Sequence, residues 1–110
     1  IYDYNSSEKV NKVFTQMTKG KLLFTMPDCP IKCGGAPQKI MWVWEDEYRK
    51  RGVREAMEIS YFTNLDSMFH VPKYAAALVT MASEKQVKPT YRCNLTKVDG
   101  KGRIATFQDL

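Results

Sequence analysis

Apolar residues at helical spacing open the chain. The serines at 6–7 can cap a helix, and Gly20 is suited to end it. Between them the apolar residues recur at spacings of three, one and three: Val10, Val13, Phe14 and Met17. The short apolar run 21–26 then stops at Pro27 and has the length of a buried strand.

A loop and a second helix follow. Residues 28–37 contain three Asp or Gly residues and two prolines, a composition that excludes regular structure. Pro37 suits the first position of a helix, which we expect to end at Arg51 with Gly52 behind it. Its expected core face consists of Ile40, Met41, Trp44 and Tyr48, widened by Trp42 and Val43. The charges of its second half are predicted to form a solvated face: Glu45, Asp46, Glu47, Arg49, Lys50 and Arg51.

The alternation continues to the end of the chain. Residues 57–63 predict a strand, 64–70 a loop, and 72–86 a helix that begins at a proline. The predicted apolar face of that helix consists of Tyr74, Leu78 and Met81, and its alanines allow neighbouring elements to pack closely. Residues 87–93 predict a third strand, and 97–104 a hairpin that turns at Asp-Gly-Lys-Gly.

The order of these elements predicts an α/β fold. Alternating helices and strands favour a Rossmann-like, open and mostly parallel sheet with flanking helices, here with a C-terminal β-hairpin. We expect 1–20 to be a leading helix and linker, and 21–110 to be the α/β domain. Loops at the carboxyl ends of parallel strands build binding sites, and 28–37 is such a loop.

Composition narrows the class of protein. The chain has 110 residues, 44% hydrophobic and 26% charged, which suits one folded domain and excludes a disordered chain. Its net charge of +5 is spread out, so we expect no nucleic-acid partner. No apolar stretch approaches the ~18 residues of a membrane-spanning helix. The chain begins at Ile1 without anything like a targeting peptide, and we expect it to be a piece of a longer polypeptide.

Cys33 is the strongest candidate for chemistry. Gly34 and Gly35 follow it and allow close backbone approach, and the predicted helix start after them favours a thiolate. Lys32 and Lys39 add positive charge. The alternative interpretations are a small structural residue in a turn and a degenerate phosphate-binding loop.

The other candidate residues carry weaker signals. Cys29 lies four residues from Cys33 and can pair with it if the loop folds back, whereas Cys93 lies in a predicted strand and is expected to be structural. A zinc site needs all three cysteines and His70, without a tight CxxC pair to anchor it, and we expect no metal. We expect His70 to be solvated or to cap a helix. The aromatic residues of the second helix are expected in the core rather than stacked on a cofactor.

Three stretches of the chain resemble the eukaryotic-type, mitochondrial sulfide:quinone oxidoreductases. The most specific is Cys33-Gly34-Gly35-Ala36-Pro37-Gln38-Lys39-Ile40-Met41, which follows Phe-Thr-Met-Pro at 24–27. Phe-His-Val-Pro-Lys-Tyr at 69–74 and Tyr-Arg-Cys-Asn-Leu at 91–95 follow in the same order. The resemblance covers essentially the whole chain, but the chain corresponds only to an internal part of that family's polypeptide.

The resemblance implies a flavoprotein built from two dinucleotide-binding folds, of which this chain is a partial domain. Such an enzyme oxidises hydrogen sulfide and passes electrons through FAD to ubiquinone at the mitochondrial inner membrane, with a small sulfur acceptor taking the sulfur. Cys33 matches one of its two redox cysteines, with the role of the thiolate that faces the flavin.

Several parts of such an enzyme are absent from this sequence. The missing parts are the FAD fingerprint, the partner cysteine, the quinone site and the membrane-facing helices. The only residues near Cys33 that suggest cofactor contact are Gly34, Gly35 and Lys39. Two rival functions remain: a stand-alone thiol redox domain that uses Cys29 and Cys33, and a non-enzymatic basic binding module.

Overall fold

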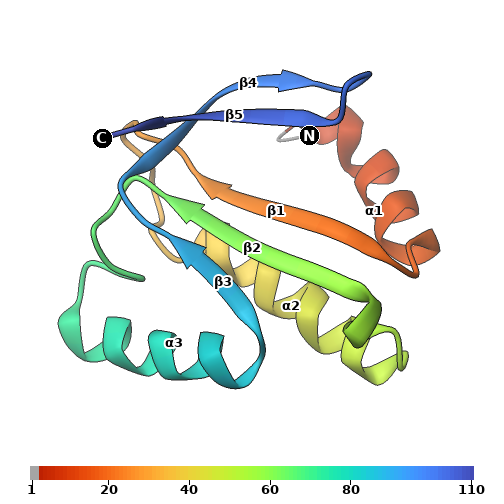
Figure 1. Cartoon of the computed structure of the whole chain (residues 1–110), viewed down its shortest axis with the longest axis horizontal. Helices are drawn as coiled ribbons and strands as arrows, with labels where there is room; N and C mark the ends of the chain where they lie inside the picture. The colour runs from red at the N-terminus through yellow and green to blue at the C-terminus, as the bar shows by residue number, and fades with distance from the viewer. Residues whose placement is uncertain (1–2) are drawn as a thin grey trace.

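Three parallel strands form the central sheet of the protein. The computed structural model describes residues 3–110, and it orders the strands β1-β2-β3 with both neighbouring pairs parallel (Figure 1). Their bounds are Gly20–Met26 for β1, Met57–Thr63 for β2 and Val87–Thr90 for β3. The predicted parallel sheet is therefore confirmed.

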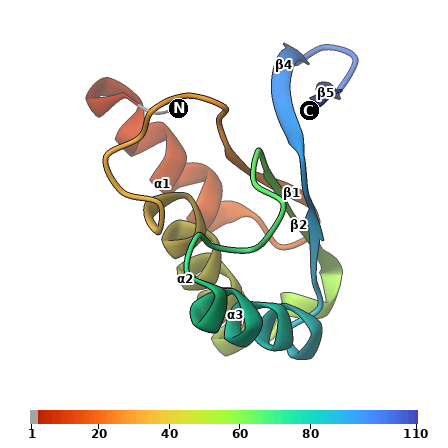
Figure 2. The same ribbon diagram turned by 90° about the vertical axis from the view of Figure 1, so that its left-hand side faces the viewer.

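The helices and the hairpin cover opposite faces of this sheet. Figure 2 shows the helices on one side and a two-stranded antiparallel hairpin on the other. The helices are α1 (Ser7–Gln16), α2 (Ala36–Lys50) and α3 (Pro72–Glu84), with short 3₁₀ turns η1 (Tyr4–Ser6) and η2 (Arg54–Ala56). The hairpin consists of β4 (Cys93–Asp99) and β5 (Ile104–Asp109). This is the α/β architecture that the sequence predicts.

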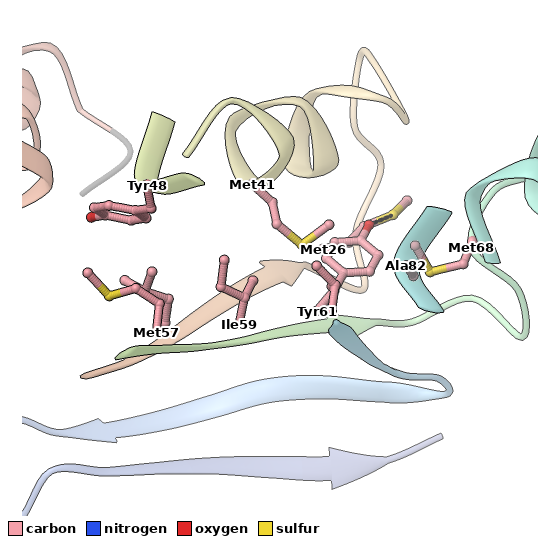
Figure 3. Packing of buried hydrophobic residues seen from close by; sticks show 10 residues of the cluster. Met26, Met41, Tyr48, Met57, Ile59, Tyr61, Met68 and Ala82 are labelled. Carbon is pink, nitrogen blue, oxygen red and sulfur yellow. Dashed lines mark hydrogen bonds between the residues drawn. The ribbon is translucent and has the colours of Figure 1, made fainter. Parts of the chain in front are cut away.

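The main core lies between β2 and α2. Met57, Ile59 and Tyr61 alternate along β2 and point toward α2, where Met41 and Tyr48 cover them (Figure 3). Side chains that alternate along a strand share a face, and burying each apolar side chain of this size contributes about 1.5–3 kcal/mol. This packing fixes α2, and therefore the loop in front of it, on the sheet.

The opposite face of β2 holds the hairpin. The rings of Phe62 and Phe107 stack there with centroids 4.0 Å apart. Stacked aromatic pairs add about 0.5–1.5 kcal/mol beyond the area that they bury. The central strand is thus covered on both faces, as parallel strands require.

Gly52 ends α2 as predicted. Its φ is 72°, a left-handed conformation that side chains disfavour. Its N–H donates to the carbonyl of Arg49, and that of Val53 donates to the carbonyl of Tyr48, at 3.0 Å each. These two bonds form the Schellman arrangement that closes many helices.

Several predicted boundaries are wrong, among them those of the hairpin, predicted over 97–104 but spanning 93–109. The first helix ends at Gln16, because Met17 is extended, and Gly20 is the first residue of β1 rather than the end of the helix. The third parallel strand stops at Thr90 instead of residue 93. Arg92 has a φ of 50°, which breaks the extended backbone, so Cys93 begins the hairpin.

The predicted faces of two helices also need correction. In α2 the buried residues are Gln38, Met41, Glu45 and Tyr48, at spacings of three, four and three. Ile40 and Val43 are about half exposed, and Trp44 is partly buried. In α3 the buried residues are Ala75 and Ala82, and Tyr74 is 58% exposed. Small side chains allow α3 to approach the sheet closely, and Leu78 of the predicted face packs, partly buried, against the core.

Glu45 is the clearest departure from the predicted solvated face. Its side chain is fully buried and forms ion pairs with three cations, Arg49, Arg54 and Lys85. Asp46, Arg49 and Lys50 are exposed as predicted. A buried carboxylate needs such partners, and two of these three come from outside α2.

Candidate redox-cysteine site

Cys33 lies in the loop that leaves the carboxyl end of β1 and leads into α2. Its side chain is exposed and its thiol is free. Gly35 is the residue before the helix, and Pro37 occupies its second position rather than the predicted first. The carbonyl of Cys33 accepts a hydrogen bond of 3.2 Å from the N–H of Ala36. The thiol therefore stands one turn ahead of a helix N-terminus, where partial positive charge favours anions.

Hydrogen bonds to other segments hold both ends of this loop. At its start, the N–H of Asp28 donates to Asn94 Oδ1 at 3.1 Å, and Asn64 Nδ2 donates to Asp28 Oδ1 at 3.2 Å. At its end, the buried Gln38 donates through Nε2 to the carbonyl of Met68. The loop after β2, residues 64–71, is thus the main neighbour of the Cys33 loop.

Gly34 also lies close to the second of these loops. A Cβ on Gly34 would stand 3.3 Å from Cδ2 and 3.5 Å from Nε2 of His70, and 3.6 Å from Cε2 of Phe69. The first distance is shorter than an ordinary contact, so a side chain at residue 34 would require the imidazole to shift by a few tenths of an ångström. A Cβ on Gly35 would be 4.0 Å from Cys33 Sγ.

Two of the three cysteines are exposed and one is buried. Cys29 is exposed in the same loop as Cys33, and the structure has no disulfide between them. Cys93 is 3% exposed, and its Sγ lies 3.6 Å from the carbonyl oxygen of Thr90 and 3.8 Å from that of Thr63. Burial raises the pKa of the Cys93 thiol, which disfavours the reactive thiolate.

The structure shows neither a metal cluster nor a bilayer-spanning helix in the part of the chain that it describes. Across residues 3–110, His, Cys, Asp and Glu side chains nowhere gather in threes that could hold a metal ion. No helix in that range has both the length and the apolar character to cross a bilayer.

The predicted cofactor-contact residues fall into two places. Gly34 lies under the imidazole of His70, whereas Gly35 and Lys39 border a groove between α2 and α3. The groove has a volume of about 710 Å³, and most of its walls are apolar. The side chains that form these walls include Trp42, Val43, Phe69, Tyr74 and Leu78.

The aromatic residues of α2 behave largely as predicted. Trp44 packs on Phe14 of α1, with ring centroids 4.8 Å apart, and on Phe24 of β1 at 5.5 Å. Tyr48 is fully buried beside them. Trp42 is partly buried, packs against the core and also lines the groove.

Sequence reasoning missed Gln38 and His70 as neighbours of the Cys33 loop. The adjacent glycines, Gly34 and Gly35, were the available signal, because glycine allows another group to lie close to the backbone. They do not indicate which residue that group belongs to. The contacts join segments that follow different strands, thirty or more residues apart.

Comparison with known proteins identifies the relatives of the chain. No protein-family profile matches it. Three curated proteins, each named mitochondrial sulfide:quinone oxidoreductase, match along nearly its whole length. The protein from Dictyostelium discoideum is 37% identical over 97% of the chain, that from Schizosaccharomyces pombe 35% over 100%, and that from Mus musculus 39% over 99%. The chain spans about a quarter of the length of these relatives, 24% of each.

Solved structures share the fold at low sequence identity. The sulfide:quinone oxidoreductase of the bacterium Aquifex aeolicus matches 96% of the chain with a TM-score of 0.71 and 9% identity. A chain in the mitochondrial ATP synthase structure of Tetrahymena thermophila matches 97% with a TM-score of 0.68 and 15% identity. These matches show the fold alone. The curated relatives confirm the resemblance read from the sequence: the chain is homologous, along nearly all of its length, to about a quarter of a mitochondrial sulfide:quinone oxidoreductase.

Proposed function

We propose that this chain is the part of a sulfide:quinone oxidoreductase that carries one of its two redox cysteines, and that Cys33 is this cysteine. The observation that supports the proposal is the exposed thiol at the carboxyl edge of a parallel sheet, one turn ahead of α2. Enzymes on open α/β sheets place their sites at this edge. Cys93 is buried and lacks this exposure.

The chemistry begins with Cys33 oxidised in a disulfide with a partner cysteine that lies outside these 110 residues. Hydrosulfide attacks the partner sulfur, an S–S bond forms to the incoming sulfur, and the original S–S bond breaks. The electron pair of the broken bond leaves on Cys33 as a thiolate, while the partner becomes a persulfide. The sulfide sulfur is thereby oxidised by two electrons and the cysteine pair is reduced by two.

Transfer of the outer sulfur to a small nucleophilic acceptor returns the second cysteine to a thiol. Re-forming the disulfide then releases two electrons and two protons. In the proposed enzyme FAD supplies the two-electron acceptor and ubiquinone the final one. We place this enzyme at the mitochondrial inner membrane, where ubiquinone dissolves, through parts beyond this chain.

The described residues do not themselves form a dinucleotide-binding site. The loop after β1 lacks the GxGxxG spacing, and His70 lies against the Cβ position of Gly34. Gly35 and Lys39 border an apolar groove rather than a phosphate cradle. We therefore assign to this chain the thiol and its support, and not the binding of FAD.

Substitution of the cysteines in the complete enzyme tests the proposal. Cys33→Ser should reduce sulfide-dependent quinone reduction by about 100-fold or more, because serine cannot form the disulfide. Cys29→Ser and Cys93→Ser are the matched controls and should retain most activity. Equal activity of Cys33→Ser and wild type would overturn the proposal, and a selective loss in Cys29→Ser would favour a Cys29–Cys33 redox pair.

The chain by itself gives a second test. Because it lacks a dinucleotide site, the purified 110-residue chain should be colourless after desalting and should not reduce quinone with sulfide. An absorbance spectrum of bound flavin that survives desalting would contradict this assignment.

A further inference from the structure

We propose that the groove between α2 and α3 is the docking site for an amphipathic helix of the same polypeptide that lies outside these 110 residues. The chain covers 24% of each curated relative, so about three quarters of such a polypeptide lies beyond the matched segment. The proposal rests on this homology to a longer protein and is independent of the role of Cys33.

Helix α2 has two faces that carry apolar side chains. One faces the sheet and forms the core. The other borders the groove at spacings of three, one and three, which is the pattern of a helix face that packs against a partner. This second face is apolar at its centre and charged at its ends: Lys39, Trp42, Val43 and Asp46.

Helix α3 forms the opposite wall of the groove. Tyr74, Ala77 and Leu78 line it, again at helical spacing. Tyr74 is 58% exposed, and Val43 on the α2 wall is 50% exposed. Figure 2 shows both helices on the side of the sheet that the hairpin does not cover. Apolar side chains that gather in an exposed groove are typical of an interaction site.

Two side chains of the α2 wall contain buried polar atoms without a hydrogen-bond partner among residues 3–110. These atoms are Gln38 Oε1 and Trp42 Nε1, an acceptor and a donor one helical turn apart. Folded proteins pair nearly all of their buried polar atoms. The two atoms therefore indicate that this wall is completed by groups from outside the segment.

The apolar character of the walls favours a helical occupant. An extended segment needs partners for its backbone N–H and C=O groups, and burying these groups unpaired costs free energy. The walls contain few polar groups that could pair with them. A helix pairs its own backbone groups, and a third helix can lie in the groove between two others at interaxial distances of about 8–10 Å.

The extent of the α2 wall sets the length of this helix. The wall runs from Gly35 to Asp46, which corresponds to about 17 Å or three turns at ~1.5 Å per residue. We therefore expect an occupant of about three turns that is apolar on one face. An acidic residue where it passes Lys39 would complement the charge at that end of the groove.

The first test measures how accessible the groove is in the complete polypeptide. Val43→Cys introduces a thiol into the groove, and Val79→Cys is its matched control. The two valines are 50% and 48% exposed, and each is the eighth residue of its helix. Iodoacetamide labelling, measured by peptide mass spectrometry, should be about tenfold slower at residue 43 than at residue 79 in the native protein. The two rates should be equal in urea, and equal native rates would overturn the proposal.

A charge in the groove gives an independent measurement. Val43→Asp should lower the urea midpoint of the complete polypeptide, because the docked helix would bury the carboxylate. Val79→Asp should leave the midpoint near the wild-type value. The exposures of the two valines within this chain are alike, so equal midpoints would contradict the presence of a covering segment.

A third experiment identifies the occupant. Lys39 at the edge of the groove is replaced by the photo-crosslinking residue p-benzoylphenylalanine in the complete polypeptide. Illumination should join it to an amphipathic helical peptide of the same molecule outside residues 1–110. Mixing isotopically light and heavy copies distinguishes crosslinks within one molecule from crosslinks between two. Crosslinks between copies would assign the groove to self-association, and slow labelling at residue 43 without any peptide crosslink would assign it to a small ligand. Either result would overturn the proposal.

These outcomes are separate from those that test the proposed function. If Cys33→Ser keeps full activity while the groove is shielded, the role of Cys33 fails and the docking site stands. If Cys33→Ser is inactive while residue 43 labels as fast as residue 79, only the docking site fails.

Discussion

The N-terminus of α2 lies near the carboxyl ends of the parallel strands, and its C-terminus lies near their amino ends. Different kinds of interaction hold these two ends of the helix. At its C-terminal half, Glu45 is fully buried and contacts Lys85 at 3.1 Å and Arg54 at 3.3 Å, in addition to Arg49. At its N-terminal end, the Cys33 loop is held by single hydrogen bonds and by the contact on Gly34. One end is fixed by buried ion pairs. The other, which we call the neutral end, is held by single hydrogen bonds, one of them accepted by the Asp28 carboxylate.

Arg51 strengthens the fixed end. Its guanidinium donates to the carbonyls of Phe14, Thr15 and Met17 at 3.1, 3.0 and 3.2 Å. These carbonyls lie at the C-terminus of α1, where unpaired acceptors and partial negative charge favour a cation. The same end of α2 therefore fastens both η2 and α1.

The difference suits the proposed chemistry. A redox thiol must be reached by sulfide and by a partner cysteine, so its loop cannot be buried under charge networks. A rigid helix anchored at its far end still presents that loop at a fixed place. We interpret the ionic end of α2 as the anchor and the neutral end as the working end.

Among the tests of the contrast between the two ends of α2, removal of the buried carboxylate should have the largest effect. Glu45→Gln should destabilise the chain by about 3 kcal/mol, because Arg54 is nearly buried and would be left without its anion. Urea unfolding followed by circular dichroism measures this. Asp46→Asn is the matched control, since the neighbouring Asp46 pairs with Lys50 at the surface, and its midpoint should stay at the wild-type value. Equal shifts in the two variants would refute the anchor.

The contribution of Glu45 to the stability of the fold should also depend on pH, and this effect is smaller than that of the substitution. Burial opposes the ionisation of Glu45, but hydrogen bonds from Arg49 and Lys85 outweigh it and hold the pKa of Glu45 below the ordinary value of 4.5. A carboxyl whose folded-state pKa is depressed stabilises the fold above its unfolded pKa, and this contribution is lost as the pH falls through the folded value.

The stability difference between wild type and Glu45→Gln should therefore be full at pH 7 and shrink below about pH 4.5. Urea midpoints of both proteins from pH 7 to pH 3 measure the difference. A gap that stays constant to pH 3 would mean that the carboxylate charge does not contribute to the anchor.

The parts of the fold that could be predicted from the sequence are those that depend on neighbouring residues. The alternation of Met57, Ile59 and Tyr61 specifies β2, and Gly52 and Pro72 mark helix ends, because each signal acts within a few residues. The loop position of Cys33 and the helix after it follow in the same way. The position of Cys33 at the carboxyl end of a parallel strand could be predicted without knowledge of contacts to distant parts of the chain.

The errors arise where partners come from far along the chain. Charged residues in a helix normally face solvent, and Glu45 departs from this because Arg54 and Lys85 reach it from other elements. The contact of Gly34 with His70 depends likewise on how two loops meet at the sheet edge. Neither pairing leaves a pattern in the sequence, since both require the folded sheet to bring the segments together.

The smallest predicted effect concerns the neutral end. Gln38 is 3% exposed, and its amide donates to the carbonyl of Met68. Gln38→Leu keeps the approximate volume but leaves that carbonyl unpaired, which should cost about 1 kcal/mol, less than the loss of Glu45. Because the contact joins only two segments, amide hydrogen exchange should speed up across 64–71 while the centre of β2 stays protected.

Gln108→Leu on the exposed hairpin is the control and should change neither measurement. If Gln38→Leu destabilises as much as Glu45→Gln, or exposes β2, the two ends of α2 are equally firm and the contrast between them fails.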